Sequence, residues 1–154
     1  MGRVGEGVAV TVTDAPDARW QAELMDLYAG QWWAEQRAPN DVVTMLNHTD
    51  LFAVAQDSGT GKLVGFARVL TDYVYLAQIL DVIVAESSRG QGIGAALMDA
   101  LCGDERLASV HSMELVCQQE LEPFYAHWGF TSRVGESRLM RRTNLGLPLA
   151  SGEG

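Results

Sequence analysis

The sequence has few of the features that tie a protein to a membrane, a metal or an oxidising compartment. No window approaches the ~20 consecutive apolar residues that a membrane helix needs. Its 154 residues include only two cysteines, Cys102 and Cys117, which favours free thiols over a disulfide framework or a metal cluster. Basic residues are scarce too, because 11 Lys and Arg face 20 Asp and Glu, and the net charge of −9 repels nucleic acid and anionic membranes. We therefore expect a cytoplasmic protein without metal, membrane or nucleic-acid partners.

Enough apolar residues are present to build one domain. Hydrophobic side chains make up 47% of the chain, which suits a single core at this length. The sequence shows no internal repeat, low-complexity tract or linker. We expect one domain over residues 1–154, with a core at about 8–142 and a loose tail at 144–154.

The hydrophobic patterns predict a mixed α/β (α+β) fold with an antiparallel start. Asp57-Ser58-Gly59-Thr60-Gly61 separates two apolar runs and is typical of a hairpin turn. Ile93, Leu97 and Leu101 recur at a spacing of four residues and predict a helix that packs on the sheet. The expected strands are 8–13, 51–56, 63–70, 73–84, 112–117, 130–134 and 138–142, and the expected helices are 14–28, 40–48, 93–103 and 122–127.

A glycine-rich segment follows the strand that ends at Val84. Arg89-Gly90-Gln91-Gly92-Ile93-Gly94 leads directly into the third predicted helix. The first amides of a helix have no internal partner and carry the positive end of its dipole, and glycine lets an anion approach the backbone closely. Arg89 adds a fixed positive charge. The segment therefore predicts a phosphate-binding loop.

A dinucleotide site is the main alternative for this loop. Gly90, Gly92 and Ala95 also match the pattern G-x-G-x-x-G/A, and Glu114 lies at a suitable distance downstream. However, a dinucleotide turn is tight, whereas residues 85–89 separate the strand from Gly90, and the chain after Gly94 is too short for the remaining strands and crossovers. A nucleotide-triphosphate loop is excluded because Gly-Lys-Ser/Thr is missing.

Two motifs resemble those of the GNAT family, the Gcn5-related N-acetyltransferases, over roughly residues 8–142. The glycine loop after Asp81-Val82-Ile83-Val84 is similar to the family's R/Q-x-x-G-x-G/A loop. Phe124-Tyr125-Ala126-His127-Trp128-Gly129-Phe130 is similar to its F-Y-x-x-x-G-F segment, and the stretch before it resembles serotonin N-acetyltransferase. The resemblance implies a mostly antiparallel sheet of six to seven strands flanked by about four helices. It also implies direct transfer of an acetyl group from acetyl-CoA to a primary amine of a small molecule or peptide.

The resemblance also implies where acetyl-CoA binds. Backbone groups of Val82 and Val84 would pair with the pantetheine arm. The amides that would bind the pyrophosphate belong to Arg89, Gly90, Gln91, Gly92, Ile93, Gly94 and Ala95. The family often has proline where this chain has Ala85. This chain also lacks the asparagine that many members carry after the next strand.

Tyr125 and Asp81 are the candidate catalytic residues. Tyr125 matches the family's tyrosine, whose ordinary pKa of ~10 keeps it protonated as an acid for the departing thiolate. Asp81 is a charged residue in an apolar strand, and burial would raise its pKa toward that of a useful base. Strict alternation would point Asp81 away from the face of the residue 82 side chain unless a bulge intervenes. The alternative for Asp81 is a salt bridge with Arg68 or with a helix.

The acceptor site would lie between the first two helices and the sheet, as the resemblance implies. Trp32 and Trp33, together with Trp20 and Tyr28, are candidate walls, and they would suit an amine on an apolar or polyamine-like body. Arg68 and Asp72 would line the same pocket or pair with each other.

Two other functions stay open at this point. One is acetylation of a protein or peptide at lysine or at the N-terminus, and the other is a catalytically silent acyl-CoA-binding module. The C-terminal arginines Arg138, Arg141 and Arg142 are candidates for a homodimer interface, or they balance the acidic charge.

Overall fold

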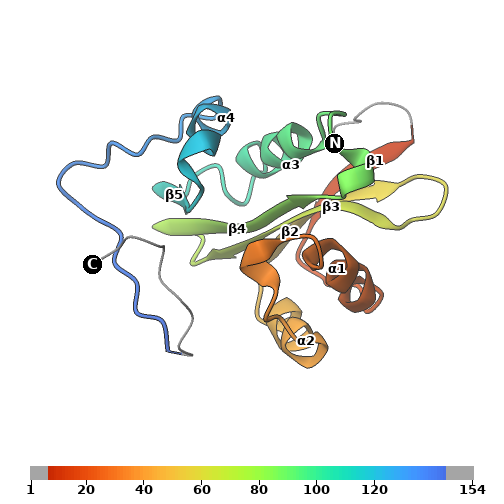
Figure 1. Cartoon of the computed structure of the whole chain (residues 1–154). Coiled ribbons are helices and arrows are strands. Elements are labelled where there is room, and N and C mark those ends of the chain that lie inside the picture. The colour runs from red at the N-terminus through yellow and green to blue at the C-terminus, as the bar shows by residue number, and fades with distance from the viewer. Residues whose placement is uncertain (1–6, 145–154) are drawn as a thin grey trace.

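One twisted sheet runs through the centre of the protein (Figure 1). The computed structural model describes residues 7–144. Within them, five strands lie in the order β1-β2-β3-β4-β5, with the first three pairings antiparallel and β4 parallel to β5. The strands are β1 (Val8–Thr13), β2 (Leu51–Asp57), β3 (Leu63–Thr71), β4 (Leu76–Val84) and β5 (Ser112–Leu115).

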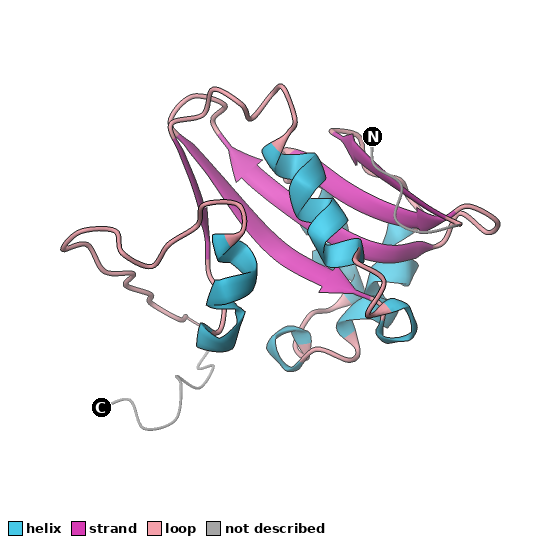
Figure 2. Cartoon of the chain, turned by 90° about the horizontal axis from the view of Figure 1, so that it is seen from above, coloured by secondary structure: helices cyan, strands magenta, loops and turns pink. Residues whose placement is uncertain are grey.

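Helices cover both faces of this sheet. The first two helices lie on one face, and the other two lie on the opposite face, with α4 close to β5 (Figures 1 and 2). None of the helices in residues 7–144 is both long and apolar enough to cross a membrane. The α-helices are α1 (Trp20–Tyr28), α2 (Pro39–Asn47), α3 (Ile93–Cys102) and α4 (Glu122–Ala126), and the short 3-10 turns are η1 (Trp32–Ala34), η2 (Glu86–Ser88) and η3 (Gln119–Leu121).

The central strands are buried on both faces, so two apolar layers form. Large side chains such as Trp20, Phe52 and Phe66 fill the layer under α1 and α2. Small residues line the sheet under α3, and a Cβ on Gly65 would lie 2.7 Å from Cγ2 of Ile93. This close approach fixes the start of α3, and with it the glycine loop, against β3.

A β-bulge interrupts the pairing of β3 with β4. The register passes from Phe66↔Ile83 to Arg68↔Leu80, so two residues of β4 lie opposite one residue of β3. Asp81 takes a φ of 56°, in the left-handed region. The bulge turns the Asp81 side chain toward α1 and α2, while Val82 packs against the α3 layer. Asp81 and Val82 thus face opposite sides of the sheet, as alternation requires.

The structure corrects several predicted boundaries. Residues 130–134 and 138–142 form no strand, so the described sheet has five strands and not six to seven. Val134, Leu139 and Met140 favour a strand by residue type, but they are exposed and no neighbouring strand pairs with them. Two elements begin later than predicted: α1 starts at Trp20, after a turn, and β4 starts at Leu76, after the turn at Tyr73.

The predicted loose tail lies almost wholly outside the described residues. Apart from Asn144, residues 144–154 lie outside the described part of the chain. The single domain with a core at 8–142 stays a prediction.

Candidate functional site

The parallel strands β4 and β5 are paired only along the first half of β4. Their pairing begins at Leu76↔Ser112 and ends at Ile79↔Leu115. β4 then continues to Val84, whereas the chain after β5 turns into η3. The second half of β4 therefore has an edge that no described strand covers.

Backbone groups of Val82 and Val84 face this open edge. The Ala85 N–H donates to the Val64 carbonyl at 2.8 Å, so Ala85 faces β3. Because hydrogen-bonding direction alternates along an antiparallel strand, the N–H and C=O groups of Val84 and Val82 point away from β3. An extended ligand with amide groups can pair with them there, as the pantetheine arm requires.

The glycine loop presents a row of free backbone donors. Gly90 and Gly92 have φ values of 81° and 78°, which turn successive amides to one side. The first backward bond of α3 runs from the Ala96 N–H to the Gly92 carbonyl at 3.0 Å. The amides from Gly90 to Ala95 donate to no acceptor in the described part of the chain, whereas the Arg89 amide is bonded to the Glu86 carbonyl at 3.3 Å. These residues fit a pyrophosphate, with the Arg89 amide as the exception.

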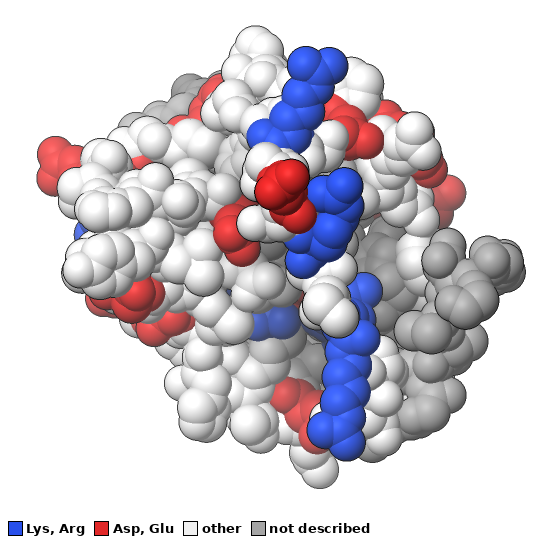
Figure 3. Space-filling model, turned by 90° about the vertical axis from the view of Figure 1, so that its left-hand side faces the viewer, with Lys and Arg blue, Asp and Glu red and all other residues white. Residues whose placement is uncertain are grey.

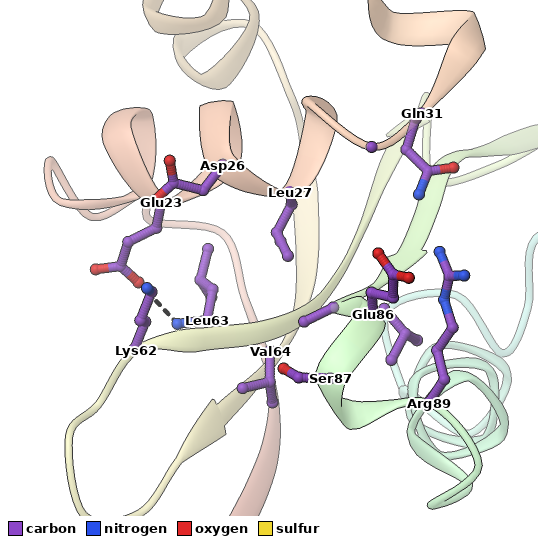
Figure 4. Close-up of a pocket in the computed structure, with 13 residues that line it drawn as sticks. Glu23, Asp26, Leu27, Gln31, Lys62, Leu63, Val64, Glu86, Ser87 and Arg89 are labelled. Carbon is purple, nitrogen blue, oxygen red and sulfur yellow. Dashed lines mark hydrogen bonds between the residues drawn. The ribbon is translucent and has the colours of Figure 1, made fainter.

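The Arg89 side chain points away from these amides. It lines a pocket of about 290 Å³ between α1 and the end of β4. Figure 4 shows Arg89 and Glu86 side by side, both directed toward Gln31. The pocket mixes acidic and basic groups, and it contains none of the residues that surround Asp81.

Tyr125 lies on α4, against the α3 side of the core. The residue is 8% exposed, and its hydroxyl has no hydrogen-bond acceptor in the described chain but remains accessible to solvent. Burial, together with the nearby Cys117, raises the pKa of Tyr125 to about 12. The hydroxyl therefore keeps its proton at neutral pH and can donate a hydrogen bond.

The Asp81 carboxylate is surrounded by donors. Tyr28 Oη donates to Oδ2 at 3.0 Å, Arg68 Nε donates to Oδ2 at 2.9 Å, and Arg37 donates to both oxygens. Asp81 is 5% exposed. Burial alone would raise its pKa, but the hydrogen bonds and charges of Arg37 and Arg68 outweigh burial and hold the pKa below its usual range. The expected rise in pKa is therefore wrong, and the alternative, a salt bridge with Arg68, is present.

Arg37 extends this cluster toward the aromatic segment. Its guanidinium carbon lies 4.7 Å from the ring centre of Tyr28 and 5.2 Å from that of Trp33. The two rings meet edge to face at 6.0 Å. Tyr28, Trp33, Arg37, Arg68 and Asp81, which we call the Asp81 cluster, thus connect α1 and the η1 segment to the bulge.

The structure separates the other two predicted acceptor residues from this cluster. Trp32 is 67% exposed and makes no aromatic contact in the described chain. Asp72 lies in the turn after β3, where its Oδ1 accepts the N–H groups of Val74, Tyr75 and Leu76. It does not pair with Arg68, because Arg68 is paired with Asp81.

Sequence reasoning did not find Arg37. Its only signal is indirect: a buried carboxylate such as Asp81 needs a cationic partner. Arg68 lies on the predicted strand 63–70, and Arg37 lies just before the predicted helix 40–48. Only the folded chain shows that both arginines bind the Asp81 carboxylate.

Comparisons with known proteins agree with this arrangement. A family model described as an acetyltransferase (GNAT) domain matches residues 48–132. A serotonin N-acetyltransferase of rice, Oryza sativa subsp. japonica, is 37% identical over 73 residues, covering 47% of this chain and 36% of the relative. A GCN5-related N-acetyltransferase of Arabidopsis thaliana is 28% identical over 130 residues, covering 82% of this chain and 54% of the relative. The chain thus spans between a third and two thirds of these relatives.

Solved structures share the fold along most of the chain. A GNAT-family protein from Xanthomonas campestris pv. campestris superposes with a TM-score of 0.74 at 27% identity, covering 90% of this chain and 96% of that one. A GNAT-family acetyltransferase from Streptococcus pneumoniae TIGR4 gives a TM-score of 0.71 at 21% identity, covering 90% and 98%, which shows the fold alone.

Proposed function

Because the chain belongs to the GNAT acetyltransferase family, we propose that it transfers an acetyl group from acetyl-CoA to an amine. The observation that carries this proposal is a pair of free backbone stretches, the open edge of β4 at Val82 and Val84 and the amides from Gly90 to Ala95, on either side of the internally bonded η2 turn. Buried or half-buried backbone groups, such as those of Val82, Val84 and Ile93, are normally hydrogen-bonded, so their lack of partners is typical of a ligand site.

The residues on this path have separate tasks. Backbone groups of Val82 and Val84 hold an extended amide-bearing arm, and the amides from Gly90 to Ala95 hold the pyrophosphate. Acetyl-CoA, when bound, supplies the acetyl group as an activated thioester. The Val82 N–H faces the same edge, where it can donate to a carbonyl oxygen.

Tyr125 is the proposed acid. Its hydroxyl lies on the α3 and α4 side and keeps its proton because its pKa is raised to about 12. Asp81 is a positioning residue in this proposal, since its oxygens are occupied by four donors and its pKa is lowered. It fixes the bulge that directs Val82 to the open edge.

The test is an acetyl-transfer assay on the purified chain. Acetyl-CoA is mixed with a panel of amines, and thiol release is followed. We expect release with at least one class of amine, and a fall in kcat of about 100-fold or more in Tyr125→Phe, which lacks the acidic hydroxyl. The dissociation constant for acetyl-CoA should change little. The matched control is Tyr75→Phe, because Tyr75 is exposed and lies beside His111.

Two outcomes would overturn the proposal. Tight acetyl-CoA binding without thiol release from any amine would favour a silent acyl-CoA-binding module. Equal rates in wild type and Tyr125→Phe would remove Tyr125 from the chemistry.

A further inference from the structure

The Asp81 cluster carries more positive than negative charge, and this excess bears on the acceptor. Building on the function proposed above, we infer that the acceptor amine also carries a carboxylate or phosphate group, which Arg68 binds. Asp81 balances one of the two arginines, Arg37 and Arg68, so one positive charge is left over. No other carboxylate in the described chain bonds to either guanidinium.

Arg68 has the free donors that this role needs. Only its Nε donates to Asp81, at 2.9 Å. Its Nη1 and Nη2 have no hydrogen-bond acceptor in residues 7–144. Neither atom is fully buried, so solvent reaches both. The side chain as a whole is only 13% exposed. A mostly buried guanidinium whose outer edge is open presents two parallel N–H groups, which match a carboxylate or phosphate.

Arg37, in contrast, is used within the protein. It binds both oxygens of Asp81 and lies over the rings of Tyr28 and Trp33. These contacts hold Asp81, and Asp81 in turn holds Arg68 through Nε. The arrangement orients the open edge of Arg68 before any ligand arrives.

The place of Arg68 suits an acceptor near the transfer point. Arg68 pairs with Leu80, and Val82, whose N–H faces the open edge of β4, is two residues further along. Two residues of a strand span about 7 Å. The acidic group and the reacting amine would therefore be close in space, which fits a small molecule such as an amino acid or an amino-sugar phosphate.

Basic groups other than Arg68 are also present on the surface. Figure 3 looks onto the left-hand side of the molecule as drawn in Figure 1, where basic and acidic side chains lie next to one another and some basic ones are recessed between uncharged residues. The described C-terminal segment carries four exposed arginines, Arg133, Arg138, Arg141 and Arg142. A polyamine-like acceptor, one of the two kinds that the predicted aromatic walls would suit, would meet the unbalanced charge of Arg68 and be repelled.

The test uses matched pairs of acceptors in the acetyl-transfer assay. The pairs are L-phenylalanine with L-phenylalaninamide, 6-aminohexanoate with hexylamine, and glucosamine 6-phosphate with glucosamine, and spermidine is added as a cationic probe. We expect the acidic member of at least one pair to have a higher kcat/KM by about 10-fold or more. In Arg68→Gln the ratio of acidic to uncharged member should fall by about 10- to 100-fold toward one, because a charge-assisted contact is lost. Arg68→Lys should restore part of the ratio.

Each outcome separates the two ideas. Equal or faster transfer to the uncharged members or to spermidine overturns the inference and leaves the acetyltransferase proposal standing. An unchanged ratio in Arg68→Gln assigns acid recognition to another residue and also overturns it. Absence of thiol release with every amine overturns the acetyltransferase proposal and the inference with it.

Discussion

Both faces of the sheet are packed with apolar side chains, but they differ in which polar groups have hydrogen-bond partners inside the protein. On the α1 and α2 face, Asp81 accepts bonds from Tyr28, Arg37 and Arg68, so the carboxylate is fully used inside the protein, although Trp20 Nε1 and both Nη groups of Arg68 have no partner in the described chain. On the α3 and α4 side, the amides of the glycine loop and the hydroxyl of Tyr125 have no partner in the described chain. Satisfied groups hold the shape of a protein, and unsatisfied ones mark where a ligand can replace water.

β4 belongs to both faces at the bulge. Asp81 is anchored in the cluster, and the next residue, Val82, packs against the α3 layer while its N–H faces the open edge. A left-handed φ at an aspartate is uncommon and costs free energy. The contacts of the Asp81 cluster offset that cost, so one face of the sheet holds the geometry that the other face uses.

The largest expected effect comes from removing the carboxylate at the centre of the Asp81 cluster, on the α1 and α2 face. Asp81→Ala leaves Arg37 and Arg68 close together without a counter-charge, and we expect a loss of about 3 kcal/mol in the free energy of unfolding. Urea unfolding measures this loss. Asp17→Ala is the matched control, because Asp17 pairs with Arg19 at the surface. A loss in Asp81→Ala no larger than that in the control would contradict the idea that this face is held by its ion pairs.

The dependence of stability on pH sharpens the same comparison. The pKa of Asp81 is lower in the folded than in the unfolded chain, so its stabilisation is present above the unfolded pKa of ~3.9 and is lost as the pH falls through the folded pKa. Asp81→Asn should lack this part of the acid-side loss. Identical acid-unfolding profiles for Asp81→Asn and wild type would show that Asp81 is not held ionised by the two arginines.

A smaller effect is expected where the groups are unsatisfied. Gly92→Ala places a Cβ on a residue with φ 78° beside the free amides, and we expect acetyl-CoA affinity to fall by about 10-fold or more. Gly135→Ala is the control, since Gly135 has φ 75° but lies in the exposed C-terminal segment. Both variants should lose a similar amount of stability, about 1 kcal/mol. Calorimetric titration with acetyl-CoA should separate them, and equal affinities in the two variants would place the pyrophosphate elsewhere.

The fold was predictable wherever a pattern is local. The hairpin of β2 and β3 follows from two apolar runs around a glycine turn, and α3 follows from the spacing of Ile93, Leu97 and Leu101. Residues 130–142 were not predictable in this way, because a strand exists only if another strand pairs with it. Residue type alone gave strands there that the structure does not contain.

The residues of the candidate site also differ in whether their contacts are local in the sequence. The glycine loop and Tyr125 lie in contiguous motifs, so their roles could be proposed from sequence, and these roles stay predictions. The environment of Asp81 depends on residues that are 53, 44 and 13 positions away, namely Tyr28, Arg37 and Arg68. Burial was foreseeable from the apolar strand around Asp81, but the direction of its pKa shift depends on both arginines at once.

The smallest expected effect tests whether the two faces act separately. Arg37→Lys keeps the positive charge but loses the two-pronged contact with Asp81 and the flat contact with Tyr28 and Trp33. We expect a loss of about 1 kcal/mol in urea unfolding and no change in the acetyl-CoA dissociation constant. Arg19→Lys, on the exposed pair with Asp17, serves as the control. A marked loss of acetyl-CoA affinity in Arg37→Lys would show that the cluster reaches the cofactor through the bulge, and that the two faces are energetically coupled at Val82.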